Sequence, residues 1–477
     1  MHRLSPMDMG FLLAESRETP MHVGGLYLFT LPEGADEQAF LSDLVEIQCG
    51  TTRWRPPFGH KLQLSALGAV GHWVPDDQLD VEYHVRHSAL PKPGRYLELF
   101  RLTARLHQTL LERHRPLWET HLIEGLQGRQ FALYSKVHHA TVDGVGAVRI
   151  AQSLLSSDPA ERREYSPLSM EAYEAGRTKR RERDPSPPTE RELRAVAEVL
   201  RESFGVSRNL WSSLKAYARA WRRPGDESLA TSWGTSPVTS FSTKITGARR
   251  FVAQSYSLER VKEVGKALGG TVNDVVLAMC GGALRRYLLS RGELPDAPLT
   301  ALTPVSIRTD AQGTLGNAVG ALVANLATHL SDPAERFETT RASMTSGKSL
   351  LSDMSPKEIE VFTQLTQAPP LLIGMLGLGD RFPPYSTVVS NVPGPRERSY
   401  WNGARLDGMY PISAIYHGFA LNLTLISNAD QLDFGVVACR QSVPACQRII
   451  DDLEDALADL EDAAGLSGGT GRKRETS

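Results

Sequence analysis

Cysteine is scarce in this chain. Four of its 477 residues are cysteines, and they stand at Cys49, Cys280, Cys439 and Cys446. No two of them have the short spacing of a zinc-binding pair, and four are too few for a disulfide framework in a chain of this length. The scarcity excludes a small disulfide-stabilised secreted fold and fits a reducing cytosol.

Neither sign of charge is in excess. Lys and Arg number 53 against 55 Asp and Glu, which gives a net charge of -2 and no global electrostatic case for binding nucleic acid. With 41% hydrophobic and 23% charged residues, the composition is that of an ordinary globular protein with an ample core. The length suggests two large domains or about three average ones.

Long hydrophobic segments are also missing. The first ten residues have no charged region followed by a long apolar region, so no signal peptide is predicted. The most apolar window, residues 368–379, is too short to span a bilayer and is rich in Pro and Gly. Any contact with a membrane is therefore predicted to be peripheral.

Alternating strand and helix patterns occupy two parts of the chain, which predicts an α/β fold with two similar halves. The predicted divisions are an N-terminal subdomain (1–160), a linker with amphipathic helices (161–245), a C-terminal subdomain (246–465) and a disordered tail (466–477). Residues 193–223 of the linker combine apolar residues at helical spacing with arginines. Such a helix can lie on a membrane surface or pack across the domain junction.

A strand that ends in two histidines is the most informative stretch. Residues 130–139 alternate as a strand does, and His138 and His139 close it. Because neighbouring strand residues point to opposite faces, the two imidazoles cannot both enter one cavity. The pattern therefore offers one imidazole for chemistry and leaves the other free for a structural role.

A neutral imidazole has a pKa of about 6.5, so it can take a proton from an alcohol and return it to a leaving group. Asp143 is predicted to orient an imidazole or to pair with an arginine such as Arg308, and Gly144 to permit a turn that a side chain would resist. A metal site would need a third ligand, and none is evident nearby. A purely structural histidine pair is the plainer alternative. The chain lacks the Gly-x-Ser-x-Gly motif of serine-nucleophile enzymes, so general-base chemistry is favoured.

Three further motifs have both a functional and a structural interpretation. Pro116-Leu117-Trp118-Glu119 is predicted to be a packing corner. Asn273 and Asp274 follow Thr271 at a helix start, where they either cap the helix or offer an amide that polarises a carbonyl. Ser390 lies close to a strand end and a rigid turn, and it either helps to stabilise an oxyanion or only terminates the strand.

The stretch His138-His139-Ala-Thr-Val-Asp143-Gly144 resembles the HHxxxDG signature of the coenzyme A-dependent acyltransferase superfamily. Five further motifs occur in the order typical of one branch: Pro20-Met-His-Val-Gly24, Pro116-Leu-Trp-Glu119, Val272-Asn-Asp274, Pro304-Val-Ser-Ile-Arg308 and Ser390-Asn-Val-Pro-Gly-Pro395. Together they are similar to the bacterial wax ester synthase/diacylglycerol acyltransferases. The likeness runs from about Leu4 to Leu460 and leaves out most of the linker.

This resemblance implies two chloramphenicol-acetyltransferase-like subdomains, with mixed β-sheets flanked by helices and an active-site tunnel between them. It implies that His139 is the general base and that His138, Asp143 and Gly144 support the turn that presents it. Asn273, Asp274 and Ser390 are expected to stabilise the oxyanion or to support the structure. No metal and no cofactor are expected, because acyl-CoA is a substrate.

The implied reaction transfers a long-chain acyl group from acyl-CoA to diacylglycerol, to a long-chain fatty alcohol, or to both. Because these lipids are insoluble, a cytoplasmic enzyme held peripherally at the inner membrane or at lipid droplets is expected. Two alternatives stay open: a condensation-like acyltransferase that uses a carrier-protein thioester, and a catalytically inactive lipid-binding scaffold.

The chain departs from the family pattern at two places. Residues 241–243 read Phe-Ser-Thr where the family often has an asparagine, and residues 427–430 read Ser-Asn-Ala-Asp where it tends to have Ser-Tyr-x-Gly. The second departure removes an aromatic residue and a glycine, which bears on the shape of the acceptor pocket more than on the chemistry.

Overall fold

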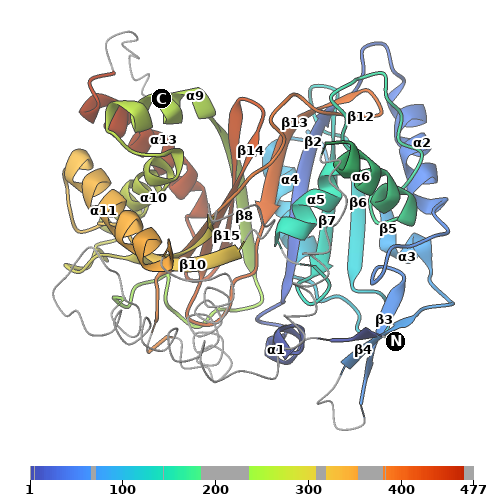
Figure 1. The fold of residues 1–477 in the computed structure, drawn as a ribbon, viewed down its shortest axis with the longest axis horizontal. Helices are drawn as coiled ribbons and strands as arrows, with labels where there is room; N and C mark the ends of the chain where they lie inside the picture. The colour runs from blue at the N-terminus through green and yellow to red at the C-terminus, as the bar shows by residue number, and fades with distance from the viewer. Residues whose placement is uncertain are drawn as a thin grey trace, which may run out of the picture.

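The computed structural model describes residues 2–4, 6–65, 71–142, 144–183, 236–307, 318–352, 380–381 and 383–466. Two six-stranded mixed sheets stand side by side, each flanked by helices (Figure 1). This arrangement confirms the predicted α/β fold with two similar halves.

The first sheet has the strand order β12-β13-β2-β7-β6-β5. Its strands are β2 (His22–Thr30), β5 (Val85–Ala89), β6 (Trp118–Glu124), β7 (Gln130–His138), β12 (Tyr400–Trp401) and β13 (Ala404–Ile412). Its helices are α2 (Glu37–Cys49), α3 (Val81–His84), α4 (Tyr96–Gln108), α5 (Gly144–Gln152) and α6 (Met170–Arg183). Helix α4 packs between the two sheets, where the Phe100 ring meets Phe251 edge-on at 5.5 Å, while α2 and α5 cover the other face (Figure 1).

The second sheet has the strand order β10-β9-β11-β14-β15-β8. Its strands are β8 (Arg249–Ser257), β9 (Thr300–Ile307), β10 (Ala318–Asn325), β11 (Thr387–Val392), β14 (Leu421–Asn428) and β15 (Gln431–Cys439). Helices α9 (Leu258–Ala267), α10 (Val272–Leu289), α11 (Pro333–Ser352) and α13 (Cys446–Ala463) lie on its side away from the first sheet (Figure 1). The central helix α10 is almost wholly buried, which explains its continuous apolar sequence.

One segment of the C-terminal half completes the N-terminal sheet. Strand β13 pairs with β2, with Met409 opposite Tyr27. Met409 N–H also donates to the buried carboxylate of Asp433 on β15 at 2.7 Å. A Cβ at Gly435 would lie 1.9 Å from the carbonyl oxygen of Pro411, so only glycine permits this close approach. The two sheets therefore do not coincide with the predicted sequence divisions 1–160 and 246–465.

A small module lies at the lower edge of Figure 1. It consists of helix α1 (Pro6–Ala14) and a three-stranded sheet in the order β1 (His2–Arg3), β4 (Gly71–Pro75), β3 (His60–Leu64). Leu12 of α1 packs in one cluster with Trp73 of β4 and with Ala140, which directly follows the two histidines. The module thus abuts the end of β7.

Only part of the predicted linker is described. Residues 170–183 form α6, whereas the amphipathic stretch 193–223, the apolar window 368–379 and nearly all of the tail lie outside the described residues. Within the described ranges, no single helix has both the length and the hydropathy to cross a membrane. Helices α9 and α10 meet that test only as a pair, and they are bent by 99° at the turn between them.

Candidate active site

Two backbone hydrogen bonds hold the end of β7 from opposite sides. His138 N–H donates to the carbonyl oxygen of Leu117 at 3.0 Å, and His139 N–H donates to that of Met21 at 2.9 Å. The His138 side chain is fully buried, whereas His139 is half-buried. The structure therefore separates the two imidazoles, as the strand pattern predicts.

Helix α1 fixes the plane of the His139 imidazole. The Phe11 ring stacks on it with the ring centroids 4.2 Å apart and an interplanar angle of 21°. An aromatic ring stacked at this distance restricts rotation of the imidazole and shields one of its faces. The two nitrogens lie on the edge of the imidazole, which the stacked Phe11 ring does not cover.

Both ring nitrogens of His138 have protein partners. Its Nδ1 accepts a hydrogen bond from Ala140 N–H at 3.1 Å, and its Nε2 lies 3.4 Å from Oε1 of Glu15. An acceptor role for Nδ1 places the proton of the neutral ring on Nε2, facing the carboxylate. His138 is therefore a structural link between β7 and Glu15.

Glu15 is a site residue that the sequence did not reveal, because no spacing connects position 15 with position 138. Its Oε1 accepts a hydrogen bond from Met21 N–H at 3.1 Å, and its Oε2 lies 3.2 Å from Nη2 of Arg113. Burial would raise the pKa of Glu15, but the contact with His138 and the Met21 N–H outweigh it and lower the pKa to about 2. The ionised carboxylate therefore joins His138 to Met21 and Arg113.

The Glu15→Gln variant is expected to lower turnover about tenfold, because the neutral amide weakens the contact that holds His138. The variant should also change how the stability of the protein depends on pH. The stabilisation by Glu15 is complete above the usual glutamate pKa of about 4.5 and is lost as the pH falls towards the folded-state pKa of about 2. Urea unfolding at a series of acidic pH values should show a smaller acid-induced loss of stability in the variant. An equal loss in both proteins would contradict this role.

The other two residues of the HHxxxDG stretch are less well defined. Asp143 lies outside the described residues, as does its predicted partner Arg308. Gly144 is the first residue of α5, and a Cβ built on it meets no described atom within 4 Å. The described atoms thus give no steric reason for a glycine there.

We expect the Gly144→Ala variant to keep its stability within about 1 kcal/mol of the wild type, since alanine is the better helix former. A thermal melt monitored by circular dichroism tests this expectation. A loss of several kcal/mol would show that the turn before α5 needs the conformational freedom of glycine after all.

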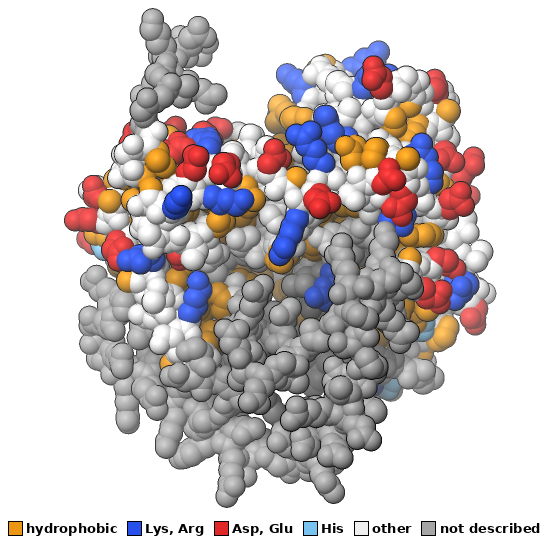
Figure 2. Space-filling view, turned by 45° about the horizontal axis from the view of Figure 1, so that its top comes forward, with side chains coloured by type: hydrophobic (Ala, Val, Ile, Leu, Met, Phe, Trp, Pro, Cys, Tyr) orange, Lys and Arg blue, Asp and Glu red, His pale blue; other side chains and the backbone are white. Residues whose placement is uncertain are grey.

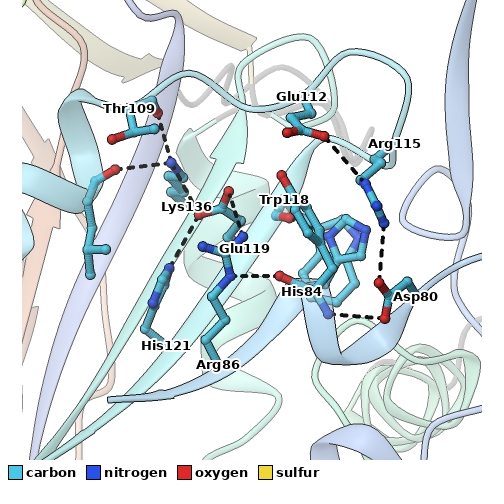
Figure 3. A network of polar contacts seen from close by, with 12 residues as sticks. Asp80, His84, Arg86, Thr109, Glu112, Arg115, Trp118, Glu119, His121 and Lys136 are labelled. Carbon is cyan, nitrogen blue, oxygen red and sulfur yellow. Dashed lines mark hydrogen bonds and ion pairs between the residues drawn. The ribbon is translucent and has the colours of Figure 1, made fainter. Parts of the chain in front are cut away.

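The Pro116–Glu119 stretch is a packing corner, as predicted (Figure 3). The Trp118 ring is 1% exposed, stacks on His84 at 4.5 Å and donates its Nε1–H to the carbonyl oxygen of Phe58 at 2.8 Å. Since the carbonyl oxygen of Leu117 also receives the His138 N–H, this corner sets the position of the histidine pair.

A network of buried charged side chains joins β7, the strand that ends in the histidine pair, to its neighbours (Figure 3). Lys136, two residues before His138, is fully buried, and its Nζ donates to the carbonyl oxygens of Leu106 at 3.0 Å and Thr109 at 2.8 Å. The same Nζ lies 3.3 Å from Oε2 of Glu119. Burial lowers the pKa of Lys136, and the Glu119 carboxylate opposes that shift. Lys136 thus joins β7 to the carbonyl end of α4, a link that the sequence did not reveal.

Asp274 caps its own helix. Its Oδ2 accepts hydrogen bonds from Thr271 N–H at 2.8 Å and from Thr271 Oγ1 at 2.7 Å, and its N–H donates back to Thr271 Oγ1 at 3.3 Å. This reciprocal capping box confirms the capping interpretation. Asn273 lies in the same first turn of α10. The structure places both residues in the helical layer on the outer side of the second sheet, away from β7 (Figure 1).

Ser390 lies on the face of the second sheet that points towards the first. It pairs with Thr424 of β14, whereas the neighbouring Leu423 and Leu425 point into the core under α10. Thr424 Oγ1 lies 2.8 Å from the Oγ of Ser413, just beyond the end of β13. A polar strip thus runs along the junction between the halves, with Ser390 half-buried in it.

A cavity of about 480 Å³ opens at this junction. It is lined by Glu18, Thr243, Lys244, Ile245, Thr246, His417, Gln441 and Ser442. Glu18 is the lining residue that comes from the first half of the chain. Its Oε2 lies 3.3 Å from Nε2 of His417, and its backbone carbonyl oxygen accepts a hydrogen bond from Arg249 at 2.6 Å. Because Glu18 follows Glu15 in one loop, this loop connects the cavity wall with the histidine pair.

The two departures from the family pattern fall in different places. Thr243 lines the cavity and donates to Ser442 at 2.7 Å. Residues 427–430 are the end of β14 and the turn into β15, and Asn428 donates to Asp433 at 3.0 Å. No group of three or more His, Cys, Asp or Glu side chains in the described ranges is arranged to hold a metal ion.

Comparison with known proteins adds family information. Residues 4–276 match the wax ester synthase/diacylglycerol acyltransferase catalytic domain, and residues 315–461 match the C-terminal domain of the same family. A probable diacylglycerol O-acyltransferase of Mycobacterium tuberculosis is 44% identical over 98% of this chain and 100% of its own length. The O-acyltransferase WSD of Acinetobacter baylyi is 38% identical over 95% of each chain.

Solved structures support the same fold. A wax ester synthase/diacylglycerol acyltransferase from Marinobacter aquaeolei superimposes with a TM-score of 0.77 and 39% identity, covering 98% of this chain and 100% of that one. The first condensation domain of the CDA synthetase matches with a TM-score of 0.55 at 18% identity, covering 98% of this chain and 97% of that one. At that identity the second match is evidence of a shared fold alone.

Proposed function

Because this chain belongs to the wax ester synthase/diacylglycerol acyltransferase family, we propose that it transfers a long-chain acyl group from acyl-CoA to diacylglycerol, a long-chain fatty alcohol, or both. The observation that carries the proposal is the half-buried His139, held at the end of β7 by its backbone and by Phe11. Acyl-CoA is a substrate here, and the proposed reaction uses no cofactor.

His139 acts as the general base. Its imidazole takes the proton of the acceptor hydroxyl while the hydroxyl oxygen attacks the thioester carbonyl. The tetrahedral intermediate collapses, the carbon–sulfur bond breaks, and the CoA thiolate takes the proton back from the imidazolium. The products are an ester and free CoA. A positioned acid/base group of this kind contributes about 10²–10⁴-fold to the rate.

The contacts of the two histidines favour this division of roles. His138 accepts at Nδ1 and faces Glu15 with Nε2, so neither nitrogen is available to a substrate. His139 is half-buried, as a group that meets a substrate must be. The contact that orients it runs through Met21, whose carbonyl oxygen accepts the His139 N–H and whose own N–H is held by Glu15.

The oxyanion needs donors on the side of the junction that His139 faces. Ser390 lies on the inner face of the second sheet and is the better candidate. Asp274 is engaged in its helix cap, and Asn273 shares that turn in the outer layer, so both support the structure instead. An oxyanion donor contributes about 10²–10³-fold to turnover.

We further propose a cytoplasmic location with peripheral attachment to the inner membrane or to lipid droplets. The support is chemical, because diacylglycerol, fatty alcohols and their esters partition into lipid. An enzyme that meets such acceptors at a lipid surface avoids extracting them into water.

A panel of acceptors tests the proposed reaction. The purified chain is mixed with palmitoyl-CoA and with hexadecanol, dioleoylglycerol or no acceptor, and the released thiol and the lipid products are measured. Acceptor-dependent thiol release with a matching ester on thin-layer chromatography is expected. Turnover only with a carrier-protein thioester would favour the condensation-like alternative, and no turnover with either donor would favour the scaffold.

A further inference from the structure

The small module beside His139 exposes large hydrophobic side chains. Leu13 of α1 is 62% exposed and Leu64 of β3 is 41% exposed. Helix α1 packs against the module through Leu12, which lies in the cluster with Trp73 and Ala140. Leu13 is not part of this cluster. Single exposed leucines are common on proteins, so these two are informative only if they share one surface.

The two leucines belong to one surface. Leu64 lies opposite Gly71 in the β3–β4 ladder, and a Cβ at Gly71 would lie 2.9 Å from the sulfur of Met9 on α1. Leu64 therefore borders the helix that carries Leu13. The same helix stacks Phe11 on His139, so the surface adjoins the proposed catalytic base.

Basic residues flank this apolar surface. Arg3 on β1 and Arg17, just after α1, are both exposed. An exposed leucine on a helix, a second on the neighbouring strand and flanking arginines together have the chemistry of a surface that lies in the interface of an anionic membrane. We refer to Arg3, Leu13, Arg17 and Leu64 as the α1 platform.

The opposite end of the molecule has a different character. Figure 2, tilted so that the top of Figure 1 comes forward, shows acidic and basic side chains interspersed over that side. Leu97 at the start of α4 is 46% exposed there, and the neighbouring Tyr96 donates to Gln130 at the far end of β7 from His138. Leu97 thus offers a control residue with similar exposure, one strand length away from the platform.

We propose that the α1 platform docks this protein on an anionic bilayer, with Leu13 and Leu64 inserted at the boundary between headgroups and acyl chains. This inference rests on the proposed function, because a lipid acceptor would then reach His139 without passing through water. Arg3 and Arg17 bind the lipid phosphates, while the leucines supply the apolar contact. Docking by this surface also orients the junction between the two halves towards the lipid.

Co-flotation with vesicles tests the docking. Vesicles of phosphatidylcholine alone, or with an equal part of phosphatidylglycerol, are mixed with the full chain and with variants of matched design. Leu13→Asp and Leu64→Asp are each expected to weaken binding about tenfold, and Arg3→Gln with Arg17→Gln to remove the preference for phosphatidylglycerol. Leu97→Asp should bind like the wild type. Equal binding by Leu13→Asp and the wild type would overturn the proposal.

Two activity assays separate docking from catalysis. With hexanol and a short-chain acyl-CoA, both soluble, Leu13→Asp should turn over like the wild type, while with dioleoylglycerol in vesicles its rate should fall about as much as its binding. Vesicle binding by a wild type that shows no turnover would contradict the proposed function and leave the docking standing. If Leu13→Asp instead breaks up an oligomer in sedimentation analysis and binds vesicles normally, the surface joins two copies of the chain and the docking is wrong.

Discussion

The His139→Ala variant is expected to lose about 10²–10⁴-fold in kcat, because it removes the group that accepts the hydroxyl proton. The fold should survive, since the side chain is half-buried and the backbone hydrogen bond to Met21 is kept in the variant. Thiol release from palmitoyl-CoA with a saturating alcohol measures the loss, and a thermal melt checks the fold. Near-normal turnover in this variant would overturn the assignment.

His138→Ala serves as the matched comparison. It deletes a fully buried imidazole and removes one partner of the Glu15 carboxylate, which keeps the Met21 N–H and Arg113, and this is expected to cost about 1–3 kcal/mol of stability. Its turnover at a temperature where it is folded should fall less than that of His139→Ala. The reverse order of activities would assign the base to His138.

Lys136→Met is expected to destabilise the protein by about 3–5 kcal/mol, although it alters no proposed catalytic group. The reason is burial: the substitution leaves the Glu119 carboxylate without its ammonium partner and removes the Lys136 donor from the carbonyl oxygens of Leu106 and Thr109, of which Leu106 keeps only a 3.4 Å bond from the Thr109 N–H. Glu119 retains His121 at 3.3 Å and Arg86 at 3.6 Å, which limits the loss. Urea unfolding measures the effect.

A double-mutant cycle with Glu119→Gln isolates the coupling between the two charges. If the pair is coupled, the double variant should be more stable than the sum of the single losses predicts. Additive losses would show that Lys136 acts through the α4 carbonyl oxygens alone. A loss below about 1 kcal/mol in Lys136→Met would contradict the structural role of the network.

Contacts between residues distant in sequence have a practical consequence for the site. Trp118 and Lys136 both act on the strand that ends in the histidines, one through the backbone of its neighbour Leu117 and the other through the end of α4. Substitutions of either residue are therefore expected to alter turnover by shifting the histidine pair. Their effect on kcat should follow their effect on the free energy of unfolding.

Features that depend on local pattern could be predicted from the amino-acid sequence. Alternation along 130–139 predicts the strand and the separation of His138 from His139, because side-chain direction follows from backbone geometry. The cap at Thr271 and Asp274 is equally local, since both partners lie within one helical turn. The fold class, too, follows from the order of strands and helices, and the family resemblance follows from several motifs that occur in the family's order along the chain.

Contacts between residues far apart in the sequence became visible in the folded structure. Glu15 reaches His138, Asp433 holds β13, and β13 completes a sheet begun nearly 380 residues earlier. No periodicity encodes such pairings, because they depend on which buried polar groups must find partners once the halves have packed together. The same packing placed Asn273 and Asp274 in an outer layer and Ser390 on the inner face. The residues next to them in the sequence do not indicate this difference.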